Sequence, residues 1–166
     1  MKILAVLVLV LCISVVSVSS QAKAGSSEFT LHNGFSGYSE GNGKLRLFFG
    51  KQRLFNVESH GYDQADGTFR IDQTVTFQGQ PSQKRSWILK TIGQNHFTGT
   101  LSDAAGRVTG RTNGSRLLLK YRLKGPLIMH QTLELMPDGK TIDNVGRITL
   151  LVITVCRLHE TITRKD

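Results

Sequence analysis

From Phe35 onward, apolar and polar residues alternate with a period of two, which is the spacing of a half-buried β-strand. Residues 68–77, 116–123 and 127–136 show this alternation most clearly. In the first of these segments the apolar positions are Phe69, Ile71, Val75 and Phe77. The pattern predicts three strands, each with one face in a core and one face in water.

Turn-forming residues separate these strands. They are Asp66-Gly67, Gly79-Gln80-Pro81, Gly93-Gln94-Asn95, Asn113-Gly114 and Pro137-Asp138-Gly139. Asn-Gly and Asp-Gly pairs are the strongest short-range signals of a β-hairpin. A meander of about eight or more strands can remove its exposed edges by closing into a barrel. We therefore expect an all-β fold, a single antiparallel up-and-down barrel, with a β-sandwich as the alternative and no long helix.

The stretch from 97 to 115, FTGTLSDAAGRVTGRTNGS, is rich in glycine. Its glycines are Gly99, Gly106, Gly110 and Gly114. Glycine permits a positive φ and a close backbone approach, so the stretch predicts two short strands joined by tight turns. We expect Asp103 to accept backbone N–H bonds in a turn. Pairing of Asp103 with Arg85 is the alternative.

The segment from 147 to 164 is apolar on both faces up to Val155 and polar afterwards. This pattern favours one strand that passes beneath neighbouring elements before it reaches the surface. Cys156 lies in its apolar part, where a small buried hydrophobic residue is expected. A reactive thiol is the alternative.

The N-terminus has the pattern of a signal peptide. Lys2 is followed by an apolar run over 3–16, and small residues flank Lys23 as required by a signal peptidase. The run is shorter than the ~20 residues of a spanning helix. We expect residues 1–24 to be removed by cleavage after Ala24, and the chain to work in the periplasm or cell envelope.

Cleavage would leave 166 − 24 = 142 residues, enough for one domain. We expect a flexible leader over 25–34 and the barrel over 35–166. Loss of Lys2 and Lys23 would lower the formal net charge from +9 to +7.

Positive charge is spread over outward strand positions, represented by Arg116, Lys120 and Arg122. A solvated face is one reading of this pattern. The other is attraction to an anionic membrane surface or another polyanion of the envelope, which salt would weaken. Export argues against nucleic acid as a partner.

Arg85 and Trp87 are two residues apart and share one face of a strand. An arginine on an inward face must be compensated, because an unpaired buried charge costs several kcal/mol. Its guanidinium could stack on the indole and donate hydrogen bonds to backbone carbonyls. Alternatively, it could bind the carboxylate or phosphate of a ligand inside the barrel.

Gln73, Tyr121 and Gln131 fall at otherwise apolar inward positions. Together with Arg85 and Trp87 they could supply the few polar groups of an apolar ligand site. They could equally satisfy one another in a solid core. The ligand-site hypothesis requires an interior cavity of about 300 Å³ or more.

The sequence contains no motif typical of a metal site or a cofactor site. The five histidines, at 32, 60, 96, 130 and 159, lack the spacing of a zinc site. Patterns of a nucleophile elbow or a phosphate-binding loop are missing from the sequence. We therefore predict no metal, no cofactor and no catalytic residue, and we do not expect an enzyme.

Several short motifs are shared with a known group of proteins. They are Phe35-x-Gly37, Gly41-x-Gly43, Arg85-x-Trp87, Phe97-Thr98-Gly99, Asp103, Gly106, Gly110, Gly114, Tyr121, Pro137-Asp138-Gly139 and Asp143-Asn144. On these residues the chain resembles a family of bacterial exported or lipid-anchored envelope proteins of unknown function. The resemblance implies a lipocalin-like barrel. A lipid anchor is not expected, because Leu11 precedes Cys12 where a small residue is required.

These observations favour a non-catalytic binder of a small apolar or amphipathic, lipid-like ligand. The alternative is a structural or interaction protein of the envelope, with a packed core and a basic outer face. An enzyme acting on lipid-like substrates would need a convergent acid-base pair, which the sequence does not indicate.

Overall fold

The computed structural model describes residues 28–165. The expected signal peptide, residues 1–24, lies outside this range. The described chain consists of one short helix and ten strands. These are α1 (Leu31–Phe35), β1 (Gly37–Leu47), β2 (Gln52–Asp63), β3 (Phe69–Phe77), β4 (Gln83–Ile92), β5 (His96–Leu101), β6 (Val108–Asn113), β7 (Arg116–Arg122), β8 (Leu127–Leu135), β9 (Thr141–Leu150) and β10 (Ile153–Arg164).

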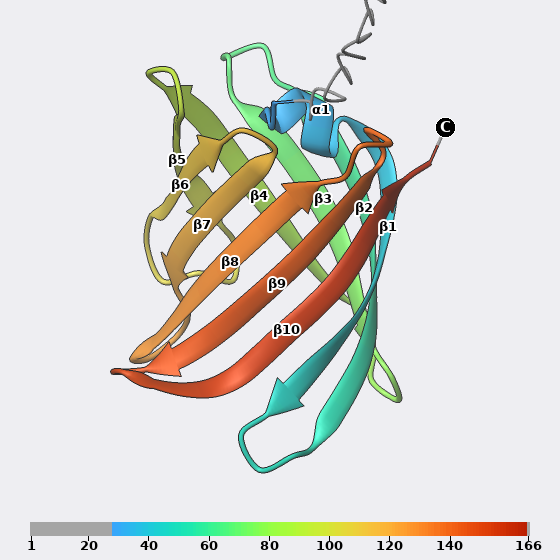
Figure 1. Ribbon diagram of the computed structural model, residues 1–166, viewed down its shortest axis with the longest axis vertical. Helices are drawn as coiled ribbons and strands as arrows, with labels where there is room; N and C mark the ends of the chain where they lie inside the picture. Colours follow the sequence, from blue (N-terminus) through green and yellow to red (C-terminus); the bar gives the residue numbers. More distant parts are fainter. Residues whose placement is uncertain (1–27, 166) are drawn as a thin grey trace, which may run out of the picture.

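The strands form one closed antiparallel barrel, in which each strand pairs with the next along the chain (Figure 1). β1 closes the barrel by pairing with β10, from Ser39 opposite Arg164 to Leu47 opposite Cys156. The predicted all-β, up-and-down, lipocalin-like barrel is confirmed, and the β-sandwich alternative is wrong.

Alternating side chains build the core, as expected. Along β7, Leu117, Leu119 and Tyr121 are buried and the residues between them are exposed. Each of the five predicted turns contains a glycine with positive φ. These are Gly67, Gly79, Gly93, Gly114 and Gly139.

The glycine-rich stretch forms β5, β6 and their turns, and glycine is used there in two ways. Gly106 and Gly114 have positive φ. A Cβ atom at Gly99 would overlap the backbone carbonyl of Ile88 on β4. At Gly110 it would press against the side chain of Leu119.

One expectation about the C-terminal segment is wrong, because residues 147–164 form two strands rather than one. β9 ends at Leu150 and β10 begins at Ile153. Between them Leu151 adopts φ +56°, a left-handed conformation that non-glycine residues rarely take. Cys156 is buried as expected, and burial raises the pKa of its thiol.

Helix α1 covers one end of the barrel, which we call the helix end (Figure 1). Phe29 is only 1% exposed and packs edge-on against Phe35, with ring centroids 5.5 Å apart. Its backbone N–H donates to the carbonyl of Gly114 at 2.8 Å. The side chain of Thr30 caps the helix by accepting from the N–H of Asn33. Of the flexible leader expected over 25–34, residues 25–27 lie outside the described range, whereas Phe29 and α1 are held to the end of the barrel by packing and hydrogen bonds.

The β1–β2 and β9–β10 turns lie at the opposite end of the barrel, which we call the tip end (Figure 1). The two ends therefore differ, because α1 lies over one of them only. The helix end carries α1 and the buried Phe29.

Candidate functional site

Three of the five candidate binding residues form one hydrogen-bonded group inside the barrel. The side-chain oxygen of Gln73 accepts from Arg85 Nε and from Trp87 Nε1, both at 2.8 Å. The amide nitrogen of Gln73 donates to the hydroxyl of Ser59 at 2.9 Å. The register explains the contact, since Gln73 on β3 lies directly opposite Arg85 on β4.

The other two candidates belong to a buried chain of hydrogen bonds that crosses β7, β8, β9 and β10. Tyr121 donates to Gln131 Oε1 at 2.8 Å, and Gln131 Nε2 donates to Asn144 Oδ1 at 3.2 Å. Asn144 in turn donates to Glu160 Oε2 at 2.8 Å. The Trp87 and Tyr121 rings meet edge-on, with centroids 5.4 Å apart. All five candidates therefore belong to one connected interior cluster.

Burial changes the acidity of two members of this cluster. It raises the pKa of the Tyr121 hydroxyl to about 12. It also raises the pKa of the Glu160 carboxyl, although the hydrogen bond from Asn144 and the charge of Arg85 act in the opposite direction. Both side chains therefore favour their neutral forms more than they would in water.

Sequence reasoning missed Ser59, Asn144 and Glu160. Their local signal is alternation with core residues, as Asn144 follows the buried Ile142 by two positions and Glu160 precedes the buried Ile162 by two. That spacing places each side chain on the inward face. Only the strand register shows that Asn144 and Glu160 lie opposite each other.

Arg85 combines features of both hypotheses. Its guanidinium carbon lies 5.9 Å from the Trp87 ring centroid, within the range of a cation–π contact. Its hydrogen-bond partner is the side chain of Gln73 rather than the expected backbone carbonyls. Among residues 28–165, no group accepts a hydrogen bond from its two terminal nitrogens.

A cavity of about 180 Å³ lies beside this cluster, inside the barrel. Its polar lining includes Arg85, Tyr121, Gln131 and Glu160. Its apolar lining consists of Leu45, Phe55, Val75, Phe77, Leu101, Leu123, Met129, Ile148 and Leu158. Many of these apolar residues lie in the strand halves nearest the tip end. The cavity is thus polar at mid-barrel and apolar toward that end.

The cavity is smaller than the ligand-site hypothesis requires. The expected volume of about 300 Å³ is not reached here, and a second interior cavity beside Trp87 holds only 40 Å³. Large side chains occupy the interior, including Phe55 and Phe77, whose ring centroids are 5.6 Å apart across β2 and β3. A drug-sized molecule cannot be enclosed in this space.

Asp103 differs from both expectations. It is exposed in the β5–β6 loop and accepts a hydrogen bond from the hydroxyl of Ser102 at 3.1 Å. In the described part of the chain, its carboxylate accepts no backbone N–H bond and forms no ion pair with Arg85. Asp103 does line the same cavity as Arg85.

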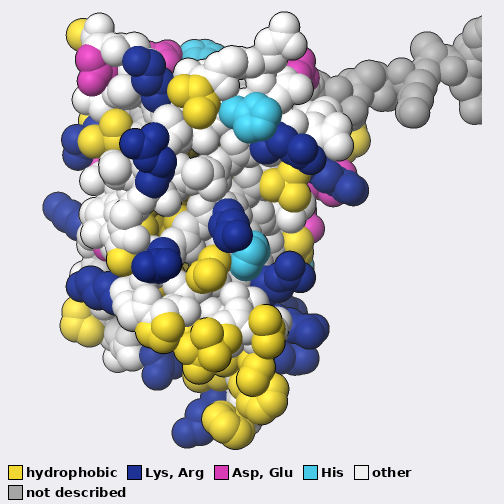
Figure 2. Space-filling model, turned by 90° about the vertical axis from the view of Figure 1, so that its left-hand side faces the viewer, with side chains coloured by type: hydrophobic (Ala, Val, Ile, Leu, Met, Phe, Trp, Pro, Cys, Tyr) yellow, Lys and Arg dark blue, Asp and Glu magenta, His cyan; other side chains and the backbone are white. Residues whose placement is uncertain are grey.

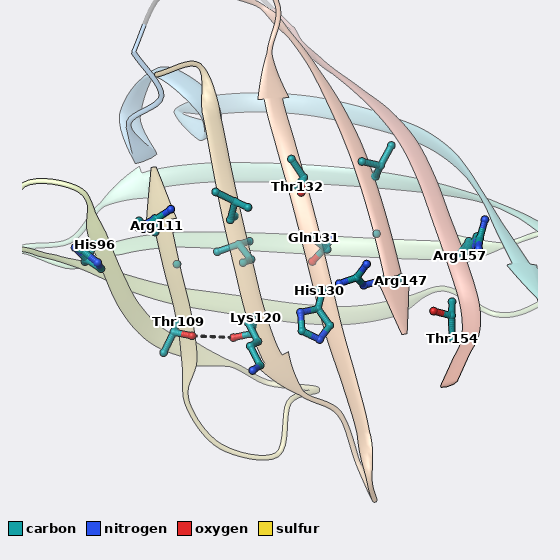
Figure 3. A pocket seen from close by; sticks show the side chains of 15 residues that line it. His96, Thr109, Arg111, Lys120, His130, Gln131, Thr132, Arg147, Thr154 and Arg157 are labelled. Atoms are coloured by element: carbon teal, nitrogen blue, oxygen red, sulfur yellow. Dashed lines mark hydrogen bonds between the residues drawn. The ribbon is translucent and has the colours of Figure 1, made fainter. Parts of the chain in front are cut away.

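A hollow of about 640 Å³ lies on the outer face of β6 to β10 (Figure 3). Its charged lining consists of Arg111, Lys120, Arg147 and Arg157, accompanied by His96 and His130. No aspartate or glutamate is among the lining residues of this hollow. Burial, followed by the charges of Arg147 and Lys120, lowers the pKa of His130.

Only one of the three basic residues singled out from the sequence lines this hollow. Lys120 does so, whereas Arg116 forms an ion pair with Glu134 at 3.2 Å. Arg122 is exposed elsewhere on β7.

Within residues 28–165, no three histidine, cysteine, aspartate or glutamate side chains converge as metal ligands would. The same part of the chain has no helix of the length and apolar character needed to cross a membrane.

Several solved structures are similar to this barrel. One is the S-type phycobiliprotein lyase CPES from Guillardia theta, with a TM-score of 0.65 and 7% identity, covering 82% of this chain and 90% of that one. Another is a DUF3598 protein of unknown function from Nostoc punctiforme, with a TM-score of 0.62 and 11% identity. It covers 89% of this chain, which spans 53% of its length. At such identities the likeness concerns the fold alone.

No curated protein matches the sequence. A family described as "Protein of unknown function (DUF3833)" matches residues 6–139. This match agrees with the expected membership of a family of unknown function, and the barrel agrees with the expected fold. The chain belongs to the DUF3833 family.

Proposed function

We propose that this protein is a non-catalytic binder of a slim amphipathic molecule that carries an anionic group. The ligand enters the barrel from the tip end and places its anionic group near Arg85. Its apolar part then lies along the apolar lining between Arg85 and the tip end.

One observation carries this proposal: the half-buried Arg85 lines the interior cavity, and within residues 28–165 its two terminal nitrogens have no hydrogen-bond acceptor. A partly buried charge loses part of its hydration, and a paired, hydrogen-bonded group of opposite charge offsets that loss. The planar guanidinium fits carboxylate or phosphate through two parallel hydrogen bonds. A ligand with such a group would compensate Arg85 where the protein does not.

The volume limits what this ligand can be. Sites that enclose drug-sized molecules measure about 300–1,000 Å³. A cavity of about 180 Å³ accepts the head and the first part of a single chain, while the rest leaves the barrel at the tip end. We therefore expect single-chain amphiphiles to bind better than bulky ring systems.

The raised pKa of Glu160 affects the same site. An ionised Glu160 would repel an anionic group near Arg85, whereas the neutral acid would not. Binding should therefore strengthen as the pH falls and Glu160 becomes protonated.

Export to the periplasm or cell envelope is part of the proposal. The pattern of residues 1–24 supports it through the positive start, the apolar run and the small residues before Gly25.

Trp87 is the only tryptophan of the chain, so its fluorescence reports on the barrel interior. We would titrate the protein with sodium dodecanoate below its micelle concentration. Arg85→Met should weaken binding about tenfold or more, because a hydrogen bond to a charged group contributes about 1.5–3 kcal/mol. Arg116→Met removes a cation from the outer face and is the matched control. Equal binding by wild type and Arg85→Met would refute the proposal.

The outer hollow supports a second candidate function, in which the protein binds a polyanion of the envelope through its basic face. Four cations without a carboxylate among them favour this alternative. Reversing Lys120 and Arg147 to glutamate should then abolish binding to heparin, used as a model polyanion. Met129→Phe, which fills the interior, should leave that binding unchanged.

A further inference from the structure

Two neighbouring hairpins at the tip end expose large apolar side chains to solvent. Phe48 and Phe49 form part of the β1–β2 turn, Leu151 and Val152 form the β9–β10 turn, and Ile153 follows as the first residue of β10. We call these five residues the apolar tip. Their exposed fractions run from 57% at Ile153 to 93% at Val152. Turn positions normally carry polar residues, so large exposed apolar side chains in these turns are unusual.

The two turns are held next to each other. Leu47 pairs with Cys156 at the end of the β1–β10 ladder, and the N–H of Phe48 donates to the carbonyl of Val155 at 3.0 Å. Figure 2 shows hydrophobic side chains gathered at the lower end of the molecule. Contiguous apolar patches on a soluble protein mark sites of interaction with proteins or membranes.

Positive charge accompanies the apolar tip. Residues 44–53 and 145–158 contain six lysines and arginines and no aspartate or glutamate. The six are Lys44, Arg46, Lys51, Arg53, Arg147 and Arg157. All six are exposed, and in the described chain none forms an ion pair. Figure 2 shows lysine and arginine side chains beside the apolar group.

This combination identifies the partner by its chemistry. A second copy docked face to face would bring like charges together, which is unfavourable. A bilayer with anionic lipids offers an apolar layer for the five side chains and phosphates for the cations. We propose that the apolar tip inserts into the interface of an anionic membrane, with the barrel standing on its tip end.

The orientation has a consequence for the interior. The apolar lining of the cavity, including Leu45, Phe55 and Leu158, continues toward the same end of the barrel. Docking would therefore turn this end of the barrel toward the lipids. The membrane proposal itself does not depend on whether the cavity holds a ligand.

Vesicle sedimentation tests the proposal. The protein would be purified from its native host, after any processing there. It would be mixed with vesicles of phosphatidylcholine alone or of phosphatidylcholine and phosphatidylglycerol in equal amounts. All variants would share the same N-terminus. We expect stronger binding to the anionic vesicles, reduced by salt. Phe49→Ser combined with Val152→Ser should weaken binding at least about tenfold, because two large apolar side chains no longer enter the bilayer.

Matched controls separate the tip from the rest of the surface. Ile92→Ser combined with Met136→Ser removes two exposed apolar side chains near the helix end and should leave vesicle binding unchanged. Lys51→Glu should weaken binding about fivefold or more, whereas Lys90→Glu, with the same change in charge, should not. Circular dichroism would verify that each variant keeps its fold.

Three results would overturn the proposal. Vesicle binding that survives the tip substitutions would show that another region docks. Failure of the wild type to bind anionic vesicles would exclude this partner. A dimer that dissociates on tip substitution, together with no vesicle binding, would assign the surface to a second copy of the chain.

Discussion

Asn144 on β9 donates a hydrogen bond of 2.8 Å to the buried carboxyl group of Glu160, which lies directly opposite on β10. This contact lets an acidic residue occupy the inside of the barrel. Burial raises the pKa of Glu160 above its ordinary value of 4.5, because the charged form loses its hydration. Glu160 therefore couples the stability of the barrel to pH.

Glu160→Gln should stabilise the protein at neutral pH, because the ionised Glu160 is disfavoured by burial. Between the unfolded and the folded pKa, the folded state binds more protons than the unfolded state, so the free energy of unfolding falls as pH rises. Glutamine keeps an acceptor for Asn144 and lacks this dependence. Denaturant unfolding from pH 4 to pH 8 should show the two proteins diverging as pH rises, while the exposed Glu58→Gln follows the wild type. Parallel curves for wild type and Glu160→Gln would contradict this account.

Gln73→Leu should destabilise the barrel more than Arg85→Met. Loss of Gln73 leaves the N–H groups of Trp87 and Arg85 without their acceptor, and an unsatisfied buried donor costs about 1–3 kcal/mol. Loss of Arg85 leaves the bond between Trp87 and Gln73 in place. Thermal unfolding of both variants measures the difference, and a larger loss in Arg85→Met would show that Arg85 is mainly structural.

Gly99→Ala should destabilise the barrel by about 1–3 kcal/mol or more. The added methyl group would meet the backbone carbonyl of Ile88, which cannot move without disturbing the β4–β5 pairing. Denaturant unfolding would be compared with Thr100→Ala, an exposed change on the same strand. An unchanged midpoint for Gly99→Ala would show that the two strands can separate at no cost.

Phe29→Ala should cost about 3–5 kcal/mol, the range for truncating a buried aromatic residue. The ring packs against Phe35 at the helix end and is almost fully buried. Hydrogen exchange should show faster opening of α1 in this variant, whereas the exposed Glu28→Ala should behave as the wild type. A stable Phe29→Ala variant would indicate that residues 28–34 attach to the barrel only weakly.

The strands and most turns could be predicted because their signals are local. The alternation in 116–123 fixes which side chains of β7 face inward, and Asn113-Gly114 supplies a conformation that suits a hairpin. The inward residues Gln73, Arg85, Trp87, Tyr121 and Gln131 could be found in the same way. Each lies two positions from another inward-facing residue of the same strand, which is enough to place it inside the barrel.

The remaining features of the fold and the site depend on contacts between strands or on turns without a local signal, which the pattern within one strand does not specify. The β9–β10 turn was missed because Leu151 and Val152 carry no turn signal, and Leu151 takes a positive φ without glycine. The pairing of Asn144 with Glu160 follows from register across the sheet. The cavity is smaller than expected because its volume depends on how large side chains from several strands share the interior.

The most direct test of the proposed function is native mass spectrometry of the protein purified from its own host, followed by organic extraction and lipid analysis. We predict a stoichiometric single-chain anionic amphiphile on the wild type and none on a folded Arg85→Met variant. Wild-type protein of bare polypeptide mass, with no extractable lipid, would contradict the account. That result would favour a packed-core protein that works through its basic outer face.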